Sequence, residues 1–277
     1  TYAGVALLTA GHGQQRLDGV DAGQMLLAWD HWDAKWYTGL AAYGYAGYKP
    51  GPSSAFFPLL PALMHFFGAP FVAGVGPPAY FVAGMVISNL AFLGALLLLQ
   101  ALATHLTGDE AIAQRAVLYL VIFPKALFAF TAYTEGIFLL LIVASYFLMR
   151  RGHFGWAGLL AGLATLTRFF GVLLVVPLVI ELARQRGRDP RAWLRASWSL
   201  LSIPAALAGF MLYLRATTGD PLGFVHAESH WARHFMEPVQ TLWVALTTTA
   251  QLPFGSTLNL NRVFDLFVVA ITLGVLI

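Results

Sequence analysis

The chain contains no cysteine and few charged residues. Without cysteine, neither a disulfide framework nor a thiolate metal site can form. Only 10% of the 277 residues are charged, whereas a soluble domain carries about 25%. The net charge of +3 does not indicate a nucleic-acid-binding protein. With 58% hydrophobic residues, the composition instead indicates a polytopic membrane protein.

Several apolar runs approach the roughly 20 residues with which an α-helix crosses the hydrocarbon core. They cover 79–103, 112–130, 134–149, 155–182, 196–216 and 263–277. A further run at 56–75 is interrupted by prolines and a glycine, which favours short re-entrant or interfacial helices. We therefore expect an all-α polytopic membrane protein with a single transmembrane domain over 1–277. Because the chain begins without methionine and ends inside an apolar run, we also expect a fragment truncated at both ends.

Arginines predict how these runs cross the membrane. One basic loop holds Arg150 and Arg151, and a second holds five arginines between 184 and 195. Such loops favour the cytoplasm. The run at 155–182 must then leave the cytoplasm and return, so we expect two short helices with Arg168 at their turn on the far side.

The same parity brings other polar groups to that non-cytoplasmic face. It places Glu135 there, together with two segments that we name the first outer loop (29–77) and the second outer loop (217–262). The first outer loop carries Asp30 and Asp33. We therefore expect a functional site on this face.

The first outer loop opens with two aspartates set among aromatic residues, from Trp29 to Tyr37. Aromatic residues of this kind mark the membrane–water interface, so one interpretation is an interfacial aromatic belt with incidental acids. Ionisable groups near the bilayer otherwise indicate function. One aspartate is then a candidate general base for an acceptor hydroxyl.

Two further charged groups allow both structural and functional interpretations. Glu135 begins an apolar run, where an acid is favourable against the helix dipole or binds a hydroxyl group of a ligand. Arg168 lies within an apolar hairpin, where an arginine usually has a partner. Its planar fork suits phosphate or carboxylate. A structural ion pair between the two residues and a phosphate site remain compatible alternatives.

Three histidines in the second outer loop, His226, His230 and His234, are four residues apart and would line one face of a helix. Imidazole is a common metal ligand. No carboxylate-containing metal signature accompanies these histidines, so we predict no metal site. An amphipathic interfacial helix that recognises the acceptor or lipid headgroups is the favoured interpretation.

Taken together, these motifs resemble the bacterial branch of the PIG-V-like (GPI mannosyltransferase II) family, within the GT-C class of membrane glycosyltransferases. The resemblance covers about 29–238, and each motif is weak alone, whereas their order and spacing are fairly specific. The matching residues are Trp32-Asp33-Ala34, Trp36-Tyr37, Gly44-Tyr45, Ala55-Phe56-Phe57-Pro58, Pro61, Pro124, Tyr133-Thr134-Glu135, Thr167-Arg168, Gly171, Gly219-Asp220-Pro221-Leu222, Trp231 and Arg233.

The resemblance implies a GT-C-type bundle that transfers a sugar, typically mannose, from a polyprenyl-phosphate donor to a hydroxyl acceptor. Transfer would invert the anomeric carbon on the lumenal face, or on the periplasmic face of a bacterial plasma membrane. Asp33 matches the expected catalytic base, whereas Asp30 lies one position outside the usual motif. Phe169-Phe170 replaces the residue pair that commonly follows the Thr-Arg. The acceptor, which is a lipid or a glycan, does not carry over to a bacterial protein.

We assign site residues on this basis. Asp33 is the catalytic base. Donor phosphate and sugar are bound by Arg168, Glu135, Lys125 and Arg233, and the supporting residues are Asp30, Trp36, Tyr37, Tyr133 and His226. The sequence requires no cofactor and is compatible with a divalent cation. Membrane lipids are expected partners, and nucleic acid is not.

Two alternatives to an enzyme remain open at the level of sequence. A secondary transporter or lipid flippase would also use broken helices and buried charges, although these would gather near the midplane of the membrane. The predicted gathering of the charges at one face, and the lack of evident inverted repeats, favour the enzyme. A non-catalytic membrane subunit of a larger assembly is the third alternative.

Overall fold

The computed structural model describes residues 26–187, 189–231, 238–251 and a few residues between 263 and 274. The described residues form helices and no strand. The chain divides into two compact units, Thr1–Ala227 and Glu228–Ile277, and each is described by itself. In the first unit the α-helices are α3 (Asp33–Gly47), α4 (Leu59–Gly68), α5 (Val72–Val75), α6 (Pro78–Thr107), α7 (Glu110–Ile122), α8 (Glu135–Arg150), α9 (Phe154–Thr165), α10 (Val175–Arg186), α11 (Pro190–Thr218) and α12 (Gly223–His226).

Short 3₁₀ helices connect several of these elements. They are η2 (Pro52–Ala55), η3 (Ala69–Phe71), η4 (Pro124–Phe130) and η5 (Phe169–Leu174). In the second unit the described helices are η6 (Ala227–Trp231), which begins at the boundary, and α13 (Pro238–Gln251).

Among the described residues, two helices are long and apolar enough to cross a membrane. They are α6, with 30 residues, and the segment Ala196–Thr218 of α11, with 23 residues. Pro78 occupies the first turn of α6, where its missing N–H is not needed, and Gly108 ends the helix in the left-handed conformation with a φ of 69°. Asp189 caps the start of α11, because its side chain accepts a hydrogen bond from the Arg191 backbone N–H. The runs expected at 79–103 and 196–216 are therefore confirmed as long helices.

The run at 155–182 forms two short helices, as predicted. After α9 ends, the chain passes through Arg168 and η5 before α10 begins. α9 packs closely on α11, because Gly158 and Gly162 have no side chain to separate the two backbones. The Ser202 hydroxyl of α11 donates a hydrogen bond to the Gly158 carbonyl across this contact.

The run at 112–130 does not form one helix. α7 ends at Ile122, Phe123 is extended, and Pro124 begins η4. The reason is local, because a residue that precedes proline is driven out of the helical region. The run at 56–75 is likewise divided among short helices, in agreement with the prediction.

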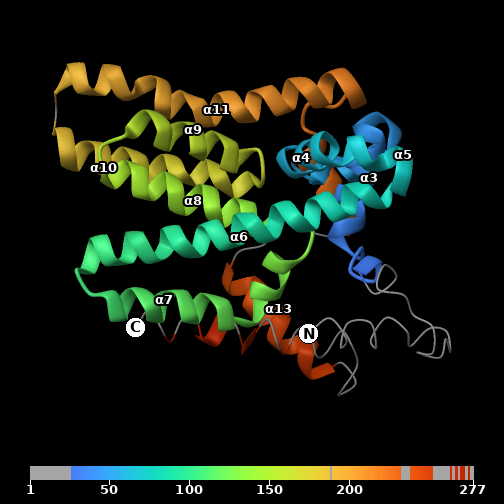
Figure 1. Ribbon diagram of the computed structural model, residues 1–277, viewed down its shortest axis with the longest axis horizontal. Helices are drawn as coiled ribbons and strands as arrows, with labels where there is room; N and C mark the ends of the chain where they lie inside the picture. The colour runs from blue at the N-terminus through green and yellow to red at the C-terminus, as the bar shows by residue number, and fades with distance from the viewer. Residues whose placement is uncertain are drawn as a thin grey trace. The chain divides into compact units, whose positions relative to one another are not determined.

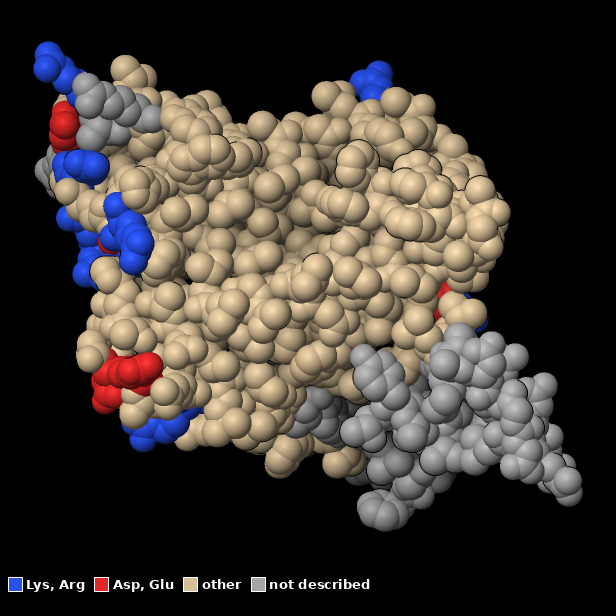
Figure 2. Space-filling model, viewed as in Figure 1, with Lys and Arg blue, Asp and Glu red and all other residues tan. Residues whose placement is uncertain are grey.

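In the first unit, α6 packs on α8, α8 packs on α9, and α9 packs on α11 (Figure 1). The shorter helices α3 and α4 contact each other and α6. In the view of Figure 2, charged side chains gather over the ends of the long helices, and a broad uncharged band lies between them. This segregation of charge is the pattern expected of helices embedded in a membrane.

Candidate functional site

A small apolar cluster fixes the start of α3 against α6. Trp29 and Ala34 pack with Phe81 and Met85 of α6 and with Tyr133. Asp33 is therefore held as the first residue of α3, where an acid is favourable against the helix dipole. The preceding Trp32 has a φ of 50°, an uncommon conformation for a residue other than glycine. Such conformations persist where the surrounding structure holds them, often at functional sites.

Two tyrosines connect this part of α3 to the turn before α8. The Tyr133 hydroxyl accepts a hydrogen bond from the Asp33 backbone N–H at 3.3 Å and donates one to the His31 carbonyl at 3.4 Å. The Tyr37 hydroxyl, one helical turn after Asp33, lies 3.4 Å from the Thr134 hydroxyl. Burial raises the pKa of both tyrosines, and the negative charge of Asp33 raises it further, so both hydroxyls stay protonated.

The arginine at the α9–η5 turn contacts the same short segment. Arg168 Nε donates to the Thr134 hydroxyl at 2.8 Å, and its Nη2 forms an ion pair with Glu135 Oε1 at 2.6 Å. Thr134 is fully buried, whereas the two charged side chains are about one-third exposed. No described residue donates a hydrogen bond to the buried Oε2 atom of Glu135. This set of contacts, from Asp33 through Tyr133 and Thr134 to Arg168, is named the acid–arginine cluster.

A tight turn presents Arg168 to this cluster. The backbone N–H of Arg168 still bonds to the Ala164 carbonyl of α9, and the Gly171 N–H bonds to the Arg168 carbonyl. A side chain on Gly171 would lie only 2.3 Å from the backbone nitrogen of Thr165. Glycine is therefore required at 171 for the chain to fold back against the end of α9.

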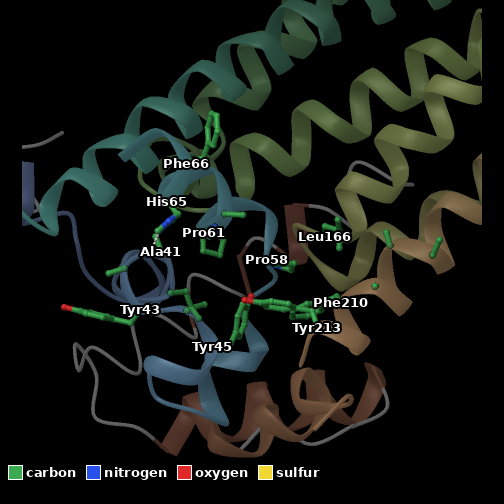
Figure 3. Close-up of a pocket in the computed structure, with 17 residues that line it drawn as sticks. Ala41, Tyr43, Tyr45, Pro58, Pro61, His65, Phe66, Leu166, Phe210 and Tyr213 are labelled. Atoms are coloured by element: carbon green, nitrogen blue, oxygen red, sulfur yellow. Dashed lines mark hydrogen bonds between the residues drawn. The ribbon is translucent and has the colours of Figure 1, made fainter. Parts of the chain in front are cut away.

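An open apolar groove of about 910 Å³ lies between α3 and the end of α9. It is lined by residues 40–45 of α3, by the first turns of α4, by Leu166 and by the middle of α11. Tyr45, Phe210 and Tyr213 gather on one side of it, and the Nδ1 atom of His65 lies 2.7 Å from the Ala41 carbonyl (Figure 3). α3 also carries Asp33, and Leu166 lies two residues before Arg168. The groove and the acid–arginine cluster are therefore formed by the same two segments of the chain.

The remaining supporting residues of the first outer loop have structural contacts. Asp30 Oδ1 accepts a hydrogen bond from the Thr38 hydroxyl at 3.1 Å, within its own segment. The Trp36 ring stacks on Phe56 at 5.1 Å, and the Lys49 ammonium lies 4.5 Å above that ring. Neither Asp30 nor Trp36 takes part in the described contacts that form the acid–arginine cluster.

His226 is paired with a neighbouring acid. Its Nδ1 atom lies 2.8 Å from Asp220 Oδ2, and this hydrogen bond lowers the pKa of Asp220. The expected helical face of histidines is wrong at this point, because α12 ends at His226 and the chain continues as a 3₁₀ helix through His230. His234 lies outside the described residues. Within the part of the chain that the structure describes, no three His, Asp or Glu side chains gather to hold a metal ion.

For two predicted phosphate ligands, Lys125 and Arg233, the structure describes no contact with the cluster. Lys125 is exposed on η4, which packs against α6, α7 and α8, and the described contacts of Glu135 and Arg168 do not include it. Arg233 lies outside the described residues. Phe169, which follows Arg168, stacks on Phe224 of α12 at 6.0 Å.

Thr134 was not predicted as a site residue, although its hydroxyl joins Tyr37 to Arg168. Its position between Tyr133 and Glu135 was the available signal. The apolar groove was also missed, because it depends on α3, α4 and α11 meeting in space. Chemically, the arrangement offers a carboxylate, a guanidinium and protonated hydroxyls beside an apolar groove.

Known proteins share sequence similarity with this chain. Residues 20–185, more than half of the chain, match the family model of PIG-V mannosyltransferases. The chain is 30% identical over 99 residues to GPI mannosyltransferase 2 of Yarrowia lipolytica, and the match covers 36% of this chain and 28% of that protein. No solved structure matches the chain. The matched range contains the positions of Asp33, Glu135 and Arg168, and the chain belongs to the PIG-V mannosyltransferase family.

Proposed function

We propose that the chain transfers a mannosyl group from a polyprenyl-phosphate donor to a hydroxyl acceptor. The proposal places the reaction at the acid–arginine cluster, on the non-cytoplasmic face of the membrane, which is the periplasmic face in a bacterium. The observation that carries it is the connection of Asp33 to the Glu135–Arg168 ion pair through Tyr133 and Thr134, beside an apolar groove.

Asp33 is the general base in this proposal. Its carboxylate removes the proton of the acceptor hydroxyl, whose oxygen forms a bond to the anomeric carbon of the sugar. The bond between that carbon and the phosphate oxygen breaks on the opposite side, so the configuration is inverted. The leaving group is the polyprenyl phosphate. The transition state has oxocarbenium character, as in other glycosyl transfers.

Arg168 stabilises the phosphate in this proposal as negative charge grows on the departing oxygen. The Nε atom binds Thr134 and one Nη2 hydrogen points to Glu135, which fixes the plane of the guanidinium. A guanidinium has five N–H groups, so donors remain for a phosphate. Preorganisation of this kind costs no rearrangement at the moment of reaction.

Glu135 is proposed to bind a sugar hydroxyl. One of its oxygens accepts from Arg168, and the other is buried without a described donor. Buried polar atoms almost always have a partner, so a hydroxyl of the donor sugar would complete this site. The proposed steps involve only side chains of the protein. A divalent cation bound to the donor phosphate would be compatible with them.

The apolar groove is proposed to hold the first isoprene units of the donor. Its walls are formed by aromatic and aliphatic side chains, among them Tyr45 and Phe210. Burial of such a chain is favourable by about 25 cal/mol per Å² of apolar surface. The phosphate would then lie near the turn that carries Arg168.

The test is a transfer assay with membranes that contain the protein, labelled polyprenyl-phosphate mannose and a panel of hydroxyl acceptors. General base catalysis contributes about 10²–10⁴-fold, so Asp33→Asn should lower turnover at least about 100-fold. The matched control is Asp109→Asn, because Asp109 caps the exposed start of α7 and asparagine caps a helix equally well. Near-normal turnover of folded Asp33→Asn would reject Asp33 as the base.

A further inference from the structure

A second cavity lies at the opposite end of α9 from Arg168. It has a volume of about 380 Å³ and is formed by the turn before α9, the end of α10 and the start of α11. α9 has 12 residues and is therefore about 18 Å long, which separates this cavity from the acid–arginine cluster. We name it the basic pocket, after the arginines that surround it.

Arg186 supplies the charge inside the basic pocket. Its Nη2 atom lies 3.9 Å from the point where a side chain on Gly152 would begin, so the guanidinium lies against the floor of the cavity. Among the described residues, no acid forms an ion pair with Arg186. His153 lines the same cavity and is exposed. Both side chains therefore have donors to offer a ligand.

The acids near the pocket are already engaged. Glu181 is almost fully buried and accepts hydrogen bonds from Arg150 Nη1 at 3.0 Å and from Gln185 at 2.7 Å. Asp189 lines the pocket, and its Oδ1 atom accepts from the Arg191 backbone N–H at 3.0 Å. Exposed arginines remain around the opening, and Figure 2 shows the basic side chains that gather over the end of α10 and the start of α11. Arginine side chains outnumber acidic ones in the described part of this region, which favours an anion.

The rim of the pocket is apolar on the side of the long helices. Trp156 lines the pocket and is 63% exposed, and Trp198 of α11 is 56% exposed beside α9. Leu194, one turn before Trp198, is 76% exposed. Tryptophan prefers the boundary between headgroups and acyl chains. The pocket therefore lies where lipid headgroups meet the protein.

We propose that the basic pocket binds the phosphate of an anionic phospholipid in the cytoplasmic leaflet. Arg186 and His153 would donate to the phosphate oxygens, and the acyl chains would lie along Trp156 and the exposed leucines. Basic pockets between membrane helices on this side bind anionic headgroups by the same physics. The lipid would join the end of α10 to the start of α9, and so support the hairpin that carries Arg168.

Native mass spectrometry of the full chain tests this proposal, with phosphatidylglycerol and phosphatidylcholine as probes. We expect phosphatidylglycerol to be retained more strongly than phosphatidylcholine. Loss of one arginine near a headgroup is expected to weaken retention about fivefold, so Arg186→Gln should show this change. The matched control is Arg115→Gln, because Arg115 is an exposed arginine on α7 that does not line the pocket.

Three results would overturn the proposal. They are equal retention of the two lipids, retention by Arg186→Gln that equals that of the unchanged chain, and displacement of the lipid by millimolar glycerol phosphate, which would indicate a site for free phosphate. Should Arg186→Gln fail to fold, Arg186→Lys keeps the charge and His153→Phe removes the second donor. Only the second of these variants should then lose phosphatidylglycerol.

Discussion

Thr134 is the residue on which the geometry of the candidate site depends most. It has no exposed surface, and its hydroxyl meets Arg168 on one side and Tyr37 on the other. Through these contacts, a residue of α3 and a residue of the α9–η5 turn adopt a fixed distance, although they are far apart in the sequence. The chemistry proposed for Asp33 and Arg168 requires such a fixed distance.

Replacing Thr134 by valine removes the hydroxyl and keeps the size of the side chain, so this variant tests the hydroxyl alone. Valine fills the same space and leaves Arg168 Nε without its acceptor, which costs about 1–3 kcal/mol for a buried donor. We expect turnover to fall at least about tenfold, and Thr134→Ser to retain most of it. Equal turnover of the two variants in the transfer assay would show that the hydroxyl has no positioning role.

Replacing Arg168 by lysine should weaken use of the donor. Lysine keeps the positive charge and loses the planar fork that reaches Thr134 and Glu135 together. We expect an increase of about tenfold in the apparent KM for the donor, measured against donor concentration at saturating acceptor. An unchanged KM with lower thermal stability would mean that Arg168 serves the fold alone.

Asp30 provides a test in which pH is varied. Burial raises the pKa of its carboxyl above the ordinary 3.8, and the Thr38 hydroxyl and the charge of Lys35 offset part of this effect. The folded chain therefore holds the proton more tightly than the unfolded chain. Its contribution to stability is complete below pH 3.8 and is lost as the pH rises through the folded-state pKa.

Asp30→Asn removes this titration while preserving an acceptor for Thr38. We expect the thermal midpoint of the variant in detergent to exceed that of the unchanged chain at pH 7. The difference should disappear as the pH falls below 3.8, where Asp30 becomes neutral in both the folded and the unfolded chain. If the thermal midpoint of Asp30→Asn at pH 7 is instead lower than that of the unchanged chain, the charge of Asp30 stabilises the fold and the prediction is wrong.

At the scale of elements, the turn between α9 and η5 depends on Gly171. A methyl group there would approach the Thr165 nitrogen to 2.3 Å, so Gly171→Ala should shift the backbone and displace Arg168. Overpacking of this kind typically costs about 1–3 kcal/mol, which should lower both the thermal midpoint and the transfer rate.

The control for this prediction is Gly209→Ala. Nothing lies within 4 Å of a side chain added at Gly209 in α11, and alanine favours a helix over glycine by about 1 kcal/mol. The thermal midpoint of Gly209→Ala should therefore be equal or higher. A Gly171→Ala variant with an unchanged midpoint would contradict the proposed role of the turn.

The sequence predicted elements whose signals are local. Length and hydropathy located α6 and α11, and the polar Thr167-Arg168 pair between two basic loops indicated the turn after α9. Hydropathy did not predict the end of α7 at Ile122, because the run stays apolar through this point. The end follows from Pro124, which drives Phe123 out of the helical conformation. The contacts of Thr134 and the apolar groove could not be predicted from spacing, because they form where distant segments meet.

At the scale of the whole molecule, chemistry and charge are divided between two ends of the helices of the first unit. The Glu135–Arg168 ion pair lies where α8 begins, and the Arg150–Glu181 ion pair lies where α8 ends. The first is beside the proposed reaction, and the second is beside the basic pocket. This division favours a membrane enzyme with one reactive face over a transporter, whose charges would lie near the midplane.

The central claim is that a covalent sugar transfer occurs at the acid–arginine cluster. The most direct measurement uses the purified full chain in vesicles with labelled polyprenyl-phosphate mannose and a hydroxyl acceptor panel. We expect label to leave the donor and enter a glycosidic product of inverted configuration, and Asp33→Asn to lower this transfer at least about 100-fold. Label that crosses the bilayer while it remains on the intact donor would instead indicate a flippase and rule out sugar transfer as the function.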